Sequence, residues 1–161
     1  MNSAILSPCE EYRYVLTRGI TGADPERKML FIMLNPSVAD ALIDDPTIRR
    51  CIGFARRENR GLLTVVNLFA LRSTDPKALR VHSDPIGPEN DIWIARYMDT
   101  HHNHTIVAAW GSDSFSIERG KLITKTYGPF KALGITRNCN PRHPLFVPAN
   151  TEFIHYDYRD I

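Results

Sequence analysis

Two continuous apolar runs separated by one amphipathic segment constrain the fold of this chain more than any other feature. Residues 29–34 (MLFIML) and 62–68 (LLTVVNL) are almost entirely apolar, which is typical of strands buried on both faces. Between these runs, apolar residues recur at helical spacing from Ile48 to Ala55, which predicts a helix over about residues 46–59. Two buried strands joined by a helix indicate a βαβ unit with parallel strands.

The rest of the chain continues this alternation. Asp45 and Pro46 supply a helix N-cap and a proline at the first helical position, which marks where the first helix begins. Further strands are expected over residues 11–18, 105–110 and 131–135, and further helices over residues 88–100 and 114–127. The first of these strands alternates apolar and polar residues, which is typical of an edge strand. The sequence therefore predicts a single α/β domain over residues 1–161, a three-layer α/β/α sandwich with a mainly parallel central sheet.

Composition excludes several protein classes. The chain has 161 residues, of which 43% are hydrophobic, and a formal net charge of +2, so it is neither a disordered tail nor a disulfide-stabilised miniprotein. No apolar run approaches the roughly 20 residues of a membrane span, and the N-terminus does not have the pattern of a signal peptide. The three cysteines form no CxxC pair, which is typical of reduced thiols. We expect a cytoplasmic protein with no membrane partner.

Polar and aromatic side chains follow each of the four expected inner strands. They are Asn35, Ser37 and Asp40 after the first, Asn67 at the end of the second, Trp110, Ser112 and Asp113 after the third, and Arg137, Asn138, Asn140, Arg142 and His143 after the fourth. Because ligands bind outside the carboxyl ends of the strands in such sheets, we expect these residues to converge on one site. Each has an alternative role. Asn35 could shape a turn and Asn67 could anchor a loop, while His143 could be a surface histidine.

Arginines are concentrated in two segments. Residues 49–60 contain five arginines and one acidic residue, and Arg137, Arg142 and His143 form a second basic cluster. Such clusters are candidates for phosphate-binding surfaces, and the alternative is a solvated helix face.

No cofactor or metal is expected. The sequence contains neither GxGxxG nor a Walker motif, so a nucleotide cofactor is not indicated. The run His101-His102-Asn103-His104 resembles a metal-binding tract, but it falls between a helix end and a strand start, at the edge opposite the expected site. We therefore interpret this run as structural, with histidine favoured at a helix C-terminus.

Four short motifs at the strand ends resemble those of the uracil-DNA glycosylase superfamily, and of its mismatch-specific branch in particular. Phe31–Ser37 (FIMLNPS) resembles the apolar strand and G-I-N-P-G motif, Val66–Leu68 the T-N-L strand end, Ala108–Gly111 the strand ending in glycine, and Arg142–Leu145 the H-P-S loop. The chain as a whole also resembles an uncharacterised family of bacterial and phage proteins with the pattern NPS…DDPTIRRC…VVNLFA…DPIGPEND…AAWG…RHPL.

The glycosylase resemblance implies roles for several of these residues. Asn35 would position the attacking water, and His143 would donate a hydrogen bond to a base oxygen. Asp40 would supply the carboxylate that stabilises the sugar cation, with Asp44 and Asp45 as alternatives.

The same resemblance implies a base-binding pocket and a grip on DNA. Asn67 would read the base edge beside Ser37, which replaces the turn glycine, and Phe69 or Trp110 would stack on the base. Phosphates would be held by Arg49, Arg50, Arg137 and Arg142. The implied function is a DNA glycosylase that excises a modified or mismatched base. The alternatives are a non-catalytic nucleic-acid or nucleotide binder and a hydrolase of small nucleosides or nucleotides.

Overall fold

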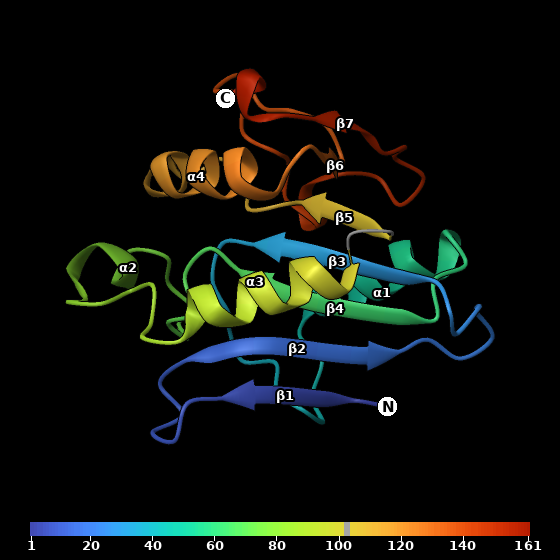
Figure 1. Ribbon diagram of the computed structural model, residues 1–161, viewed down its shortest axis with the longest axis horizontal. Coiled ribbons are helices and arrows are strands. Elements are labelled where there is room, and N and C mark those ends of the chain that lie inside the picture. Colours follow the sequence, from blue (N-terminus) through green and yellow to red (C-terminus); the bar gives the residue numbers. More distant parts are fainter. Residues whose placement is uncertain (102–103) are drawn as a thin grey trace.

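The computed structural model describes residues 1–101 and 104–161, and within them it has a seven-stranded sheet with helices packed against it (Figure 1). The strands are β1 (Ser3–Leu6), β2 (Arg13–Gly19), β3 (Lys28–Met33), β4 (Leu62–Asn67), β5 (Thr105–Ala108), β6 (Phe130–Ala132) and β7 (Ile154–Tyr156). The α-helices are α1 (Pro46–Arg57), α2 (Ala78–Val81), α3 (Asn90–His101) and α4 (Ile117–Tyr127). The strand order is β1-β2-β4-β3-β5-β6-β7, so the chain is an α/β protein.

The predicted βαβ unit forms the centre of the sheet. β3 and β4 pair in parallel over their full lengths, from Lys28 opposite Leu62 to Met33 opposite Asn67. The intervening α1 begins where the sequence predicts, because the Asp45 carboxylate accepts a hydrogen bond of 2.8 Å from the backbone N–H of Ile48. The strands and helix of the prediction are therefore confirmed here.

The sheet is mixed, and the prediction of a mainly parallel sheet was wrong. β4, β3, β5 and β6 are parallel to one another, but β1, β2 and β7 pair with their neighbours in antiparallel fashion. β2 is not an edge strand, because β1 pairs with its outer side. The alternating pattern of β2 was misleading because two of its polar side chains, Arg13 and Arg18, are buried.

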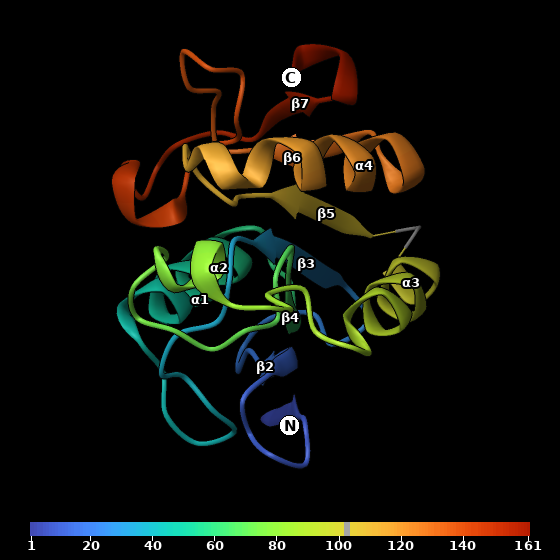
Figure 2. The same cartoon turned by 90° about the vertical axis from the view of Figure 1, so that its left-hand side faces the viewer.

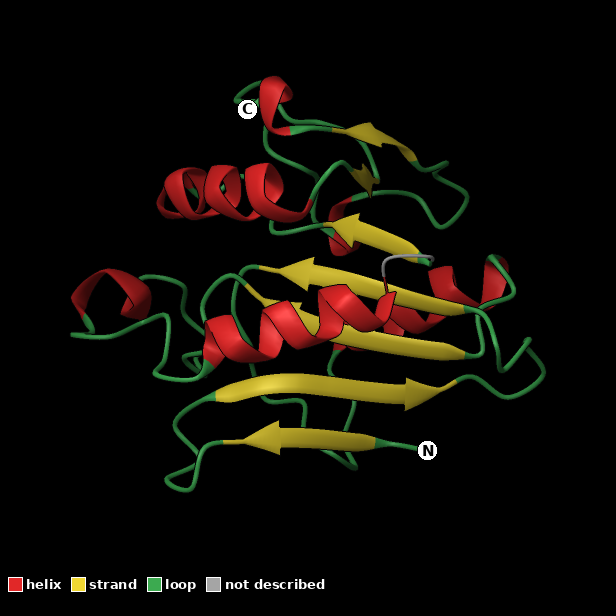
Figure 3. Cartoon of the chain, in the orientation of Figure 1, coloured by secondary structure: helices red, strands yellow, loops and turns green. Residues whose placement is uncertain are grey.

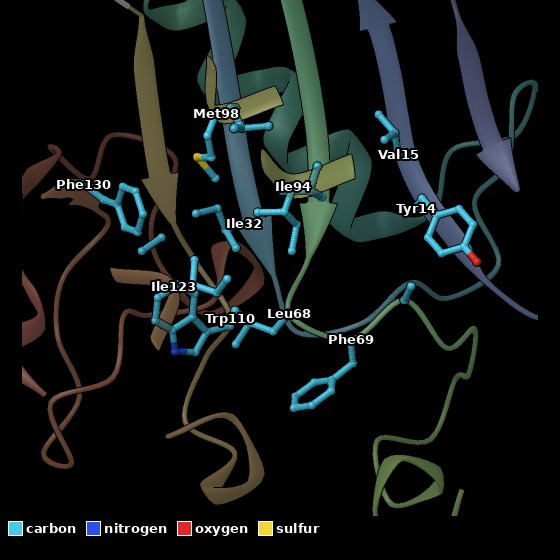
Figure 4. Packing of buried hydrophobic residues seen from close by; sticks show 14 of the residues in the cluster. Tyr14, Val15, Ile32, Leu68, Phe69, Ile94, Met98, Trp110, Ile123 and Phe130 are labelled. Atoms are coloured by element: carbon cyan, nitrogen blue, oxygen red, sulfur yellow. The ribbon is translucent and has the colours of Figure 1, made fainter. Parts of the chain in front are cut away.

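Each face of the sheet carries its own apolar cluster. On one face, α3 and α4 pack against the strands through residues such as Ile94 and Ile123, and Figure 4 shows Ile123 beside Trp110 and Ile94 beside Ile32. On the other face, α1 contributes Ile48 and Phe54 to a second cluster. Figure 2 shows α1 and α3 on opposite sides of the sheet. No helix in the described part of the chain is long and apolar enough to cross a membrane.

The parallel strands direct their carboxyl ends to one edge of the sheet. Figure 3 shows the arrowheads of β3 and β5 at the same side, and loops leave the sheet there. The loops that follow β3, β4, β5 and β6 carry most of the residues that the sequence singles out. This edge therefore positions the candidate site.

Candidate functional site

A cavity of about 730 Å³ opens at the carboxyl edge of the parallel strands. It is lined by side chains from the ends of β3 and β4, from the start of α1, and from the loops that follow β5 and β6. Nine of the residues expected to converge on the site line it: Asn35, Ser37, Asn67, Trp110, Ser112, Asp113, Arg137, Arg142 and His143. The structure therefore brings together segments from all four strand ends.

Asn35 is held in one orientation by its amide nitrogen. Its Nδ2 donates to the carbonyl oxygens of Pro36, Leu71 and Ser73 at 3.1, 3.3 and 3.0 Å. These bonds tie the loop after β3 to the loop after β4, so the turn-forming role considered for Asn35 is present. They also fix the amide plane and leave the Oδ1 atom as the acceptor that Asn35 can offer to the cavity.

Asn67 is the most unusual residue of the cavity wall. Its side chain is only 1% exposed, yet neither Nδ2 nor Oδ1 has a hydrogen-bond partner in residues 1–101 or 104–161. Its loop-anchoring alternative is therefore not supported, since the amide binds no loop within those residues. An unmatched buried amide is costly, and one that lines a cavity can be satisfied by a ligand.

Asn140 provides a useful contrast to Asn67. Its amide is also buried, and the described residues offer it no partner. Asn140 does not belong to the cavity lining, whereas Asn67 does. Of these two buried amides, Asn67 is therefore the one beside which a ligand in the cavity would lie.

His143 presents its Nε2 side as a hydrogen-bond donor. The backbone N–H of Leu145 donates to Nδ1 at 3.2 Å, so the proton of the neutral ring lies on Nε2. Burial lowers the pKa of His143 below its ordinary value, and the charge of Asp45 raises it in part. A neutral ring with an Nε2–H donor therefore lines the cavity at physiological pH.

Of the three candidate carboxylates, Asp45 lines the cavity, whereas Asp40, which the sequence analysis favours, does not. The Asp40 carboxylate accepts hydrogen bonds from the N–H groups of Leu42 and Ile43, which hold its pKa below the ordinary value, and it lies outside the cavity lining. Asp44 is also outside and forms an ion pair with Arg18, with 2.7 Å between Nε and Oδ1. Asp45 lines the cavity while it caps α1.

Neither predicted stacking residue offers a free ring face to the cavity. Phe69 does not line the cavity, and its ring stacks on Phe115 with 4.9 Å between centroids. Trp110 contributes to the lining, but its indole is buried and meets the ring of Tyr156 edge-on at 5.8 Å. Both rings belong to the apolar core beside α4 (Figure 4).

The structure places the two predicted groups of arginines differently with respect to the cavity. Arg49 donates to the carbonyl of Asp44, and Arg50 donates to the carbonyls of Pro144 and Val147, so these side chains fasten loops within the chain. Neither lines the cavity. Arg137 and Arg142 are exposed and do line it, which places two cations at its rim.

Sequence reasoning missed Arg13. This residue of β2 lines the cavity although its side chain is only 2% exposed. Burial lowers its pKa to about 10, while the charge of Asp45 acts in the opposite direction. The sequence signal was weak, because an arginine in an alternating strand is normally on the solvent face. Asp113 also lines the cavity, but it is paired with Arg80 at 2.5 Å.

The described histidines of the run, His101 and His104, do not line this cavity. His101 is buried at the end of α3, with its Nδ1 2.9 Å from the carbonyl of Tyr97. His102 and Asn103 lie outside the described residues. Among the residues that are described, no group of three or more His, Cys, Asp or Glu side chains could hold a metal ion.

The comparison with protein families covers most of the chain. Residues 13–145 match the family described as "Protein of unknown function (DUF1643)". The chain belongs to the DUF1643 family. No curated protein and no solved structure matches it. In this DUF1643 protein, the matched region includes Arg13, Asp45 and the loops that follow all four strands, so the family match spans nearly the whole cavity.

Proposed function

We propose that the cavity binds a nucleobase and hydrolyses its N-glycosidic bond, as a DNA glycosylase acting on a modified or mismatched base. The observation that carries this proposal is the buried amide of Asn67, which lacks a partner among the described residues and lines the cavity. An amide presents one donor group and one acceptor, and base edges present the complementary pairs. The resemblance to the uracil-DNA glycosylase superfamily, with the three-layer sandwich it implies, belongs to the same proposal.

The remaining side chains match the charges that develop during this reaction. A water molecule attacks the sugar C1′ while the bond from C1′ to the base nitrogen breaks, and the electron pair of that bond leaves with the base. The Oδ1 atom of Asn35 accepts a hydrogen bond from the water, and the Asp45 carboxylate stabilises the cationic sugar. The Nε2–H group of His143 donates to an acceptor atom of the base as negative charge builds there. The proton lost by the water neutralises the departing base.

The rim of the cavity supports binding of a phosphate-linked substrate. Arg137 and Arg142 are exposed side chains of the lining, so they can meet phosphates that remain partly solvated. Because Arg49 and Arg50 of α1 are engaged with backbone carbonyls, this grip is smaller than the one implied by the sequence.

An abasic-site assay tests the proposal. The full chain is incubated with single-stranded and duplex oligonucleotides carrying uracil, mismatched thymine, hypoxanthine, or hydroxymethylated or glucosylated pyrimidines, and alkali then cleaves any abasic site. We expect scission of at least one substrate. His143→Ala should reduce the rate about 10²–10³-fold, as expected for loss of one preorganised donor. His82→Ala is the matched control, because His82 is paired with Glu11 and lies outside the cavity lining.

The outcomes separate the candidate functions. Salt-sensitive DNA binding without scission would exclude catalysis on these bases and favour a non-catalytic binder. Scission that His143→Ala leaves intact would contradict the assigned chemistry.

A hydrolase of free nucleosides or nucleotides is the second candidate. The engagement of Arg49 and Arg50 within the chain favours it, because among residues 1–101 and 104–161 only two lining arginines, Arg137 and Arg142, are exposed at the rim. This candidate predicts release of the base from free nucleosides or nucleotides, measured by chromatography, with little dependence on salt.

A further inference from the structure

Two buried arginines on β2 differ in how their hydrogen bonds are satisfied. Arg13 and Arg18 are each 2% exposed, and both reach the segment between β3 and α1. The guanidinium of Arg18 uses all three nitrogens: Nε pairs with Asp44, Nη1 donates to the carbonyl of Thr17, and Nη2 donates to the carbonyls of Asp40 and Ile43. Arg18 is therefore fully accounted for as a structural residue.

Arg13 leaves one side of its guanidinium unused. Its Nη1 donates to the carbonyl of Ala39. Its Nε is buried, and within the described ranges no hydrogen bond is made by either Nε or Nη2. The N–H groups of Nε and Nη2 point in nearly the same direction and form a planar fork for two adjacent acceptors. Arg13 lines the cavity, so a ligand that reaches its guanidinium would meet this fork.

The charges around Arg13 indicate what kind of acceptor fits. The charges of Asp45 and Asp40 act on Arg13 in one direction and those of Arg72 and Arg18 in the other, and of these four groups Asp45 is the one in the cavity lining. A phosphate or carboxylate placed against Arg13 would therefore also meet a like charge. An uncharged pair of acceptors avoids that repulsion. Phosphates instead have Arg137 and Arg142, which are exposed at the rim.

We propose that Arg13 recognises the O6 and N7 atoms of an oxopurine, a base of the guanine or hypoxanthine type. The inference rests on the proposed function, because it requires that the cavity hold a nucleobase. O6 and N7 are adjacent acceptors that arginine binds through two parallel hydrogen bonds. Uracil and thymine have no adjacent acceptor pair. The O2 and N3 pair of cytosine borders the glycosidic bond, whereas the buried fork of Arg13 suits the edge remote from the sugar.

Asn67 is compatible with the same base. An oxopurine presents the O6 acceptor beside the N1–H donor, and this pair complements the donor and acceptor of an amide. In the described part of the chain, three buried side chains of the lining have polar atoms without a hydrogen-bond partner. They are Arg13 through Nε, Asn67 through Nδ2 and Oδ1, and Trp110 through Nε1, and the Trp110 indole is packed in the core. One ligand class thus satisfies both Arg13 and Asn67.

Binding of 7-deaza analogues tests the assignment without requiring base release. Calorimetry compares deoxyguanosine and deoxyinosine with their 7-deaza analogues, in which a C–H group replaces N7, and with deoxycytidine and deoxyuridine. We expect the oxopurines to bind about 10-fold more tightly than their 7-deaza analogues and than the pyrimidines, since one lost hydrogen bond to a charged donor has that effect. Arg13→Lys should abolish the discrimination. Arg18→Lys is the matched control, which should weaken folding but retain the discrimination.

Several results would overturn the proposal. They are equal affinity for deoxyguanosine and its 7-deaza analogue, tighter binding of deoxycytidine or deoxyuridine, and binding of inorganic phosphate that Arg13→Lys abolishes. If Arg13→Lys does not fold, the comparison of analogues with the unchanged protein decides alone. The proposed hydrolysis is refuted by a different result: no substrate releases its base, although the protein still binds oxopurines more tightly than their 7-deaza analogues.

Discussion

Replacement of Asn67 by leucine should stabilise the protein while it abolishes ligand binding. Leucine has nearly the shape of asparagine, so Asn67→Leu removes two buried polar atoms that have no partner within residues 1–101 and 104–161, and leaves little cavity behind. An unsatisfied buried polar group costs roughly 1–3 kcal/mol, so we expect the free energy of unfolding to rise by about that amount. For a chain of this size, each kcal/mol raises Tm by about 2–4 °C.

Two other buried amides provide the controls. Asn90 donates through Nδ2 to the carbonyls of Asn67 and Leu68 at 3.0 and 3.2 Å, so Asn90→Leu should lower the free energy of unfolding by about 1–3 kcal/mol. Asn140→Leu should stabilise the protein as Asn67→Leu does, but it should leave ligand binding unchanged because Asn140 is not in the cavity wall. Urea denaturation monitored by circular dichroism measures all three variants. A loss of more than 1 kcal/mol in Asn67→Leu would show that the amide has a structural role and would refute the reasoning.

Three further predictions concern charge, pH and packing. Asp45→Asn should retain the helix cap, because asparagine caps as well as aspartate, but it should slow base release about 10²-fold. Asp40→Asn should not slow it, and equal rates for the two variants would contradict the assignment of the carboxylate. Burial lowers the pKa of His101 to about 4, below its unfolded value of about 6.5, so the unfolded state alone takes up a proton as pH falls through this interval. Above pH 6.5, His101 should therefore not make the free energy of unfolding depend on pH. Between pH 6.5 and pH 4, the unchanged protein should lose up to about 3 kcal/mol of stability that His101→Gln does not lose, and urea titrations at several pH values measure this difference. Gly120→Ala should destabilise the protein by about 1–3 kcal/mol, because the new β-carbon would lie 2.8 Å from the buried indole ring that follows β5. Gly53→Ala should stabilise it by up to about 1 kcal/mol, because the new β-carbon would meet no atom within 4 Å beyond its chain neighbours and its own helix backbone. Thermal denaturation measures both variants.

The centre of the fold could be predicted because its signals are local. The continuous apolar runs at 29–34 and 62–68 and the helical spacing between them require no knowledge of distant partners. The edges of the sheet could not be predicted in this way. β1 and β7 have only four and three residues, and each is defined by pairing with another strand rather than by its own pattern.

Convergence of the strand ends could be predicted from topology, but the direction of individual side chains could not. The sequence identifies Asp45 as a helix cap, but it does not show that this cap lies beside the cavity while Asp40 closes a loop outside it. Arg50 is engaged by carbonyls of Pro144 and Val147, more than 90 residues away in sequence, so no local pattern distinguishes it from a phosphate ligand.

The unsatisfied groups of Arg13 and Asn67 link the stability of the protein to its ligand. In the free protein both carry buried atoms without partners among the described residues, so a ligand that supplies the missing acceptors and donors removes that penalty as it binds. Such a ligand binds the folded state alone and raises Tm by an amount that grows with the logarithm of its concentration divided by its Kd. A thermal-shift screen of nucleosides should therefore rank the bases by how fully they satisfy both groups, with oxopurines first. The ranking should collapse in Asn67→Leu, whose higher intrinsic Tm no nucleoside would raise further.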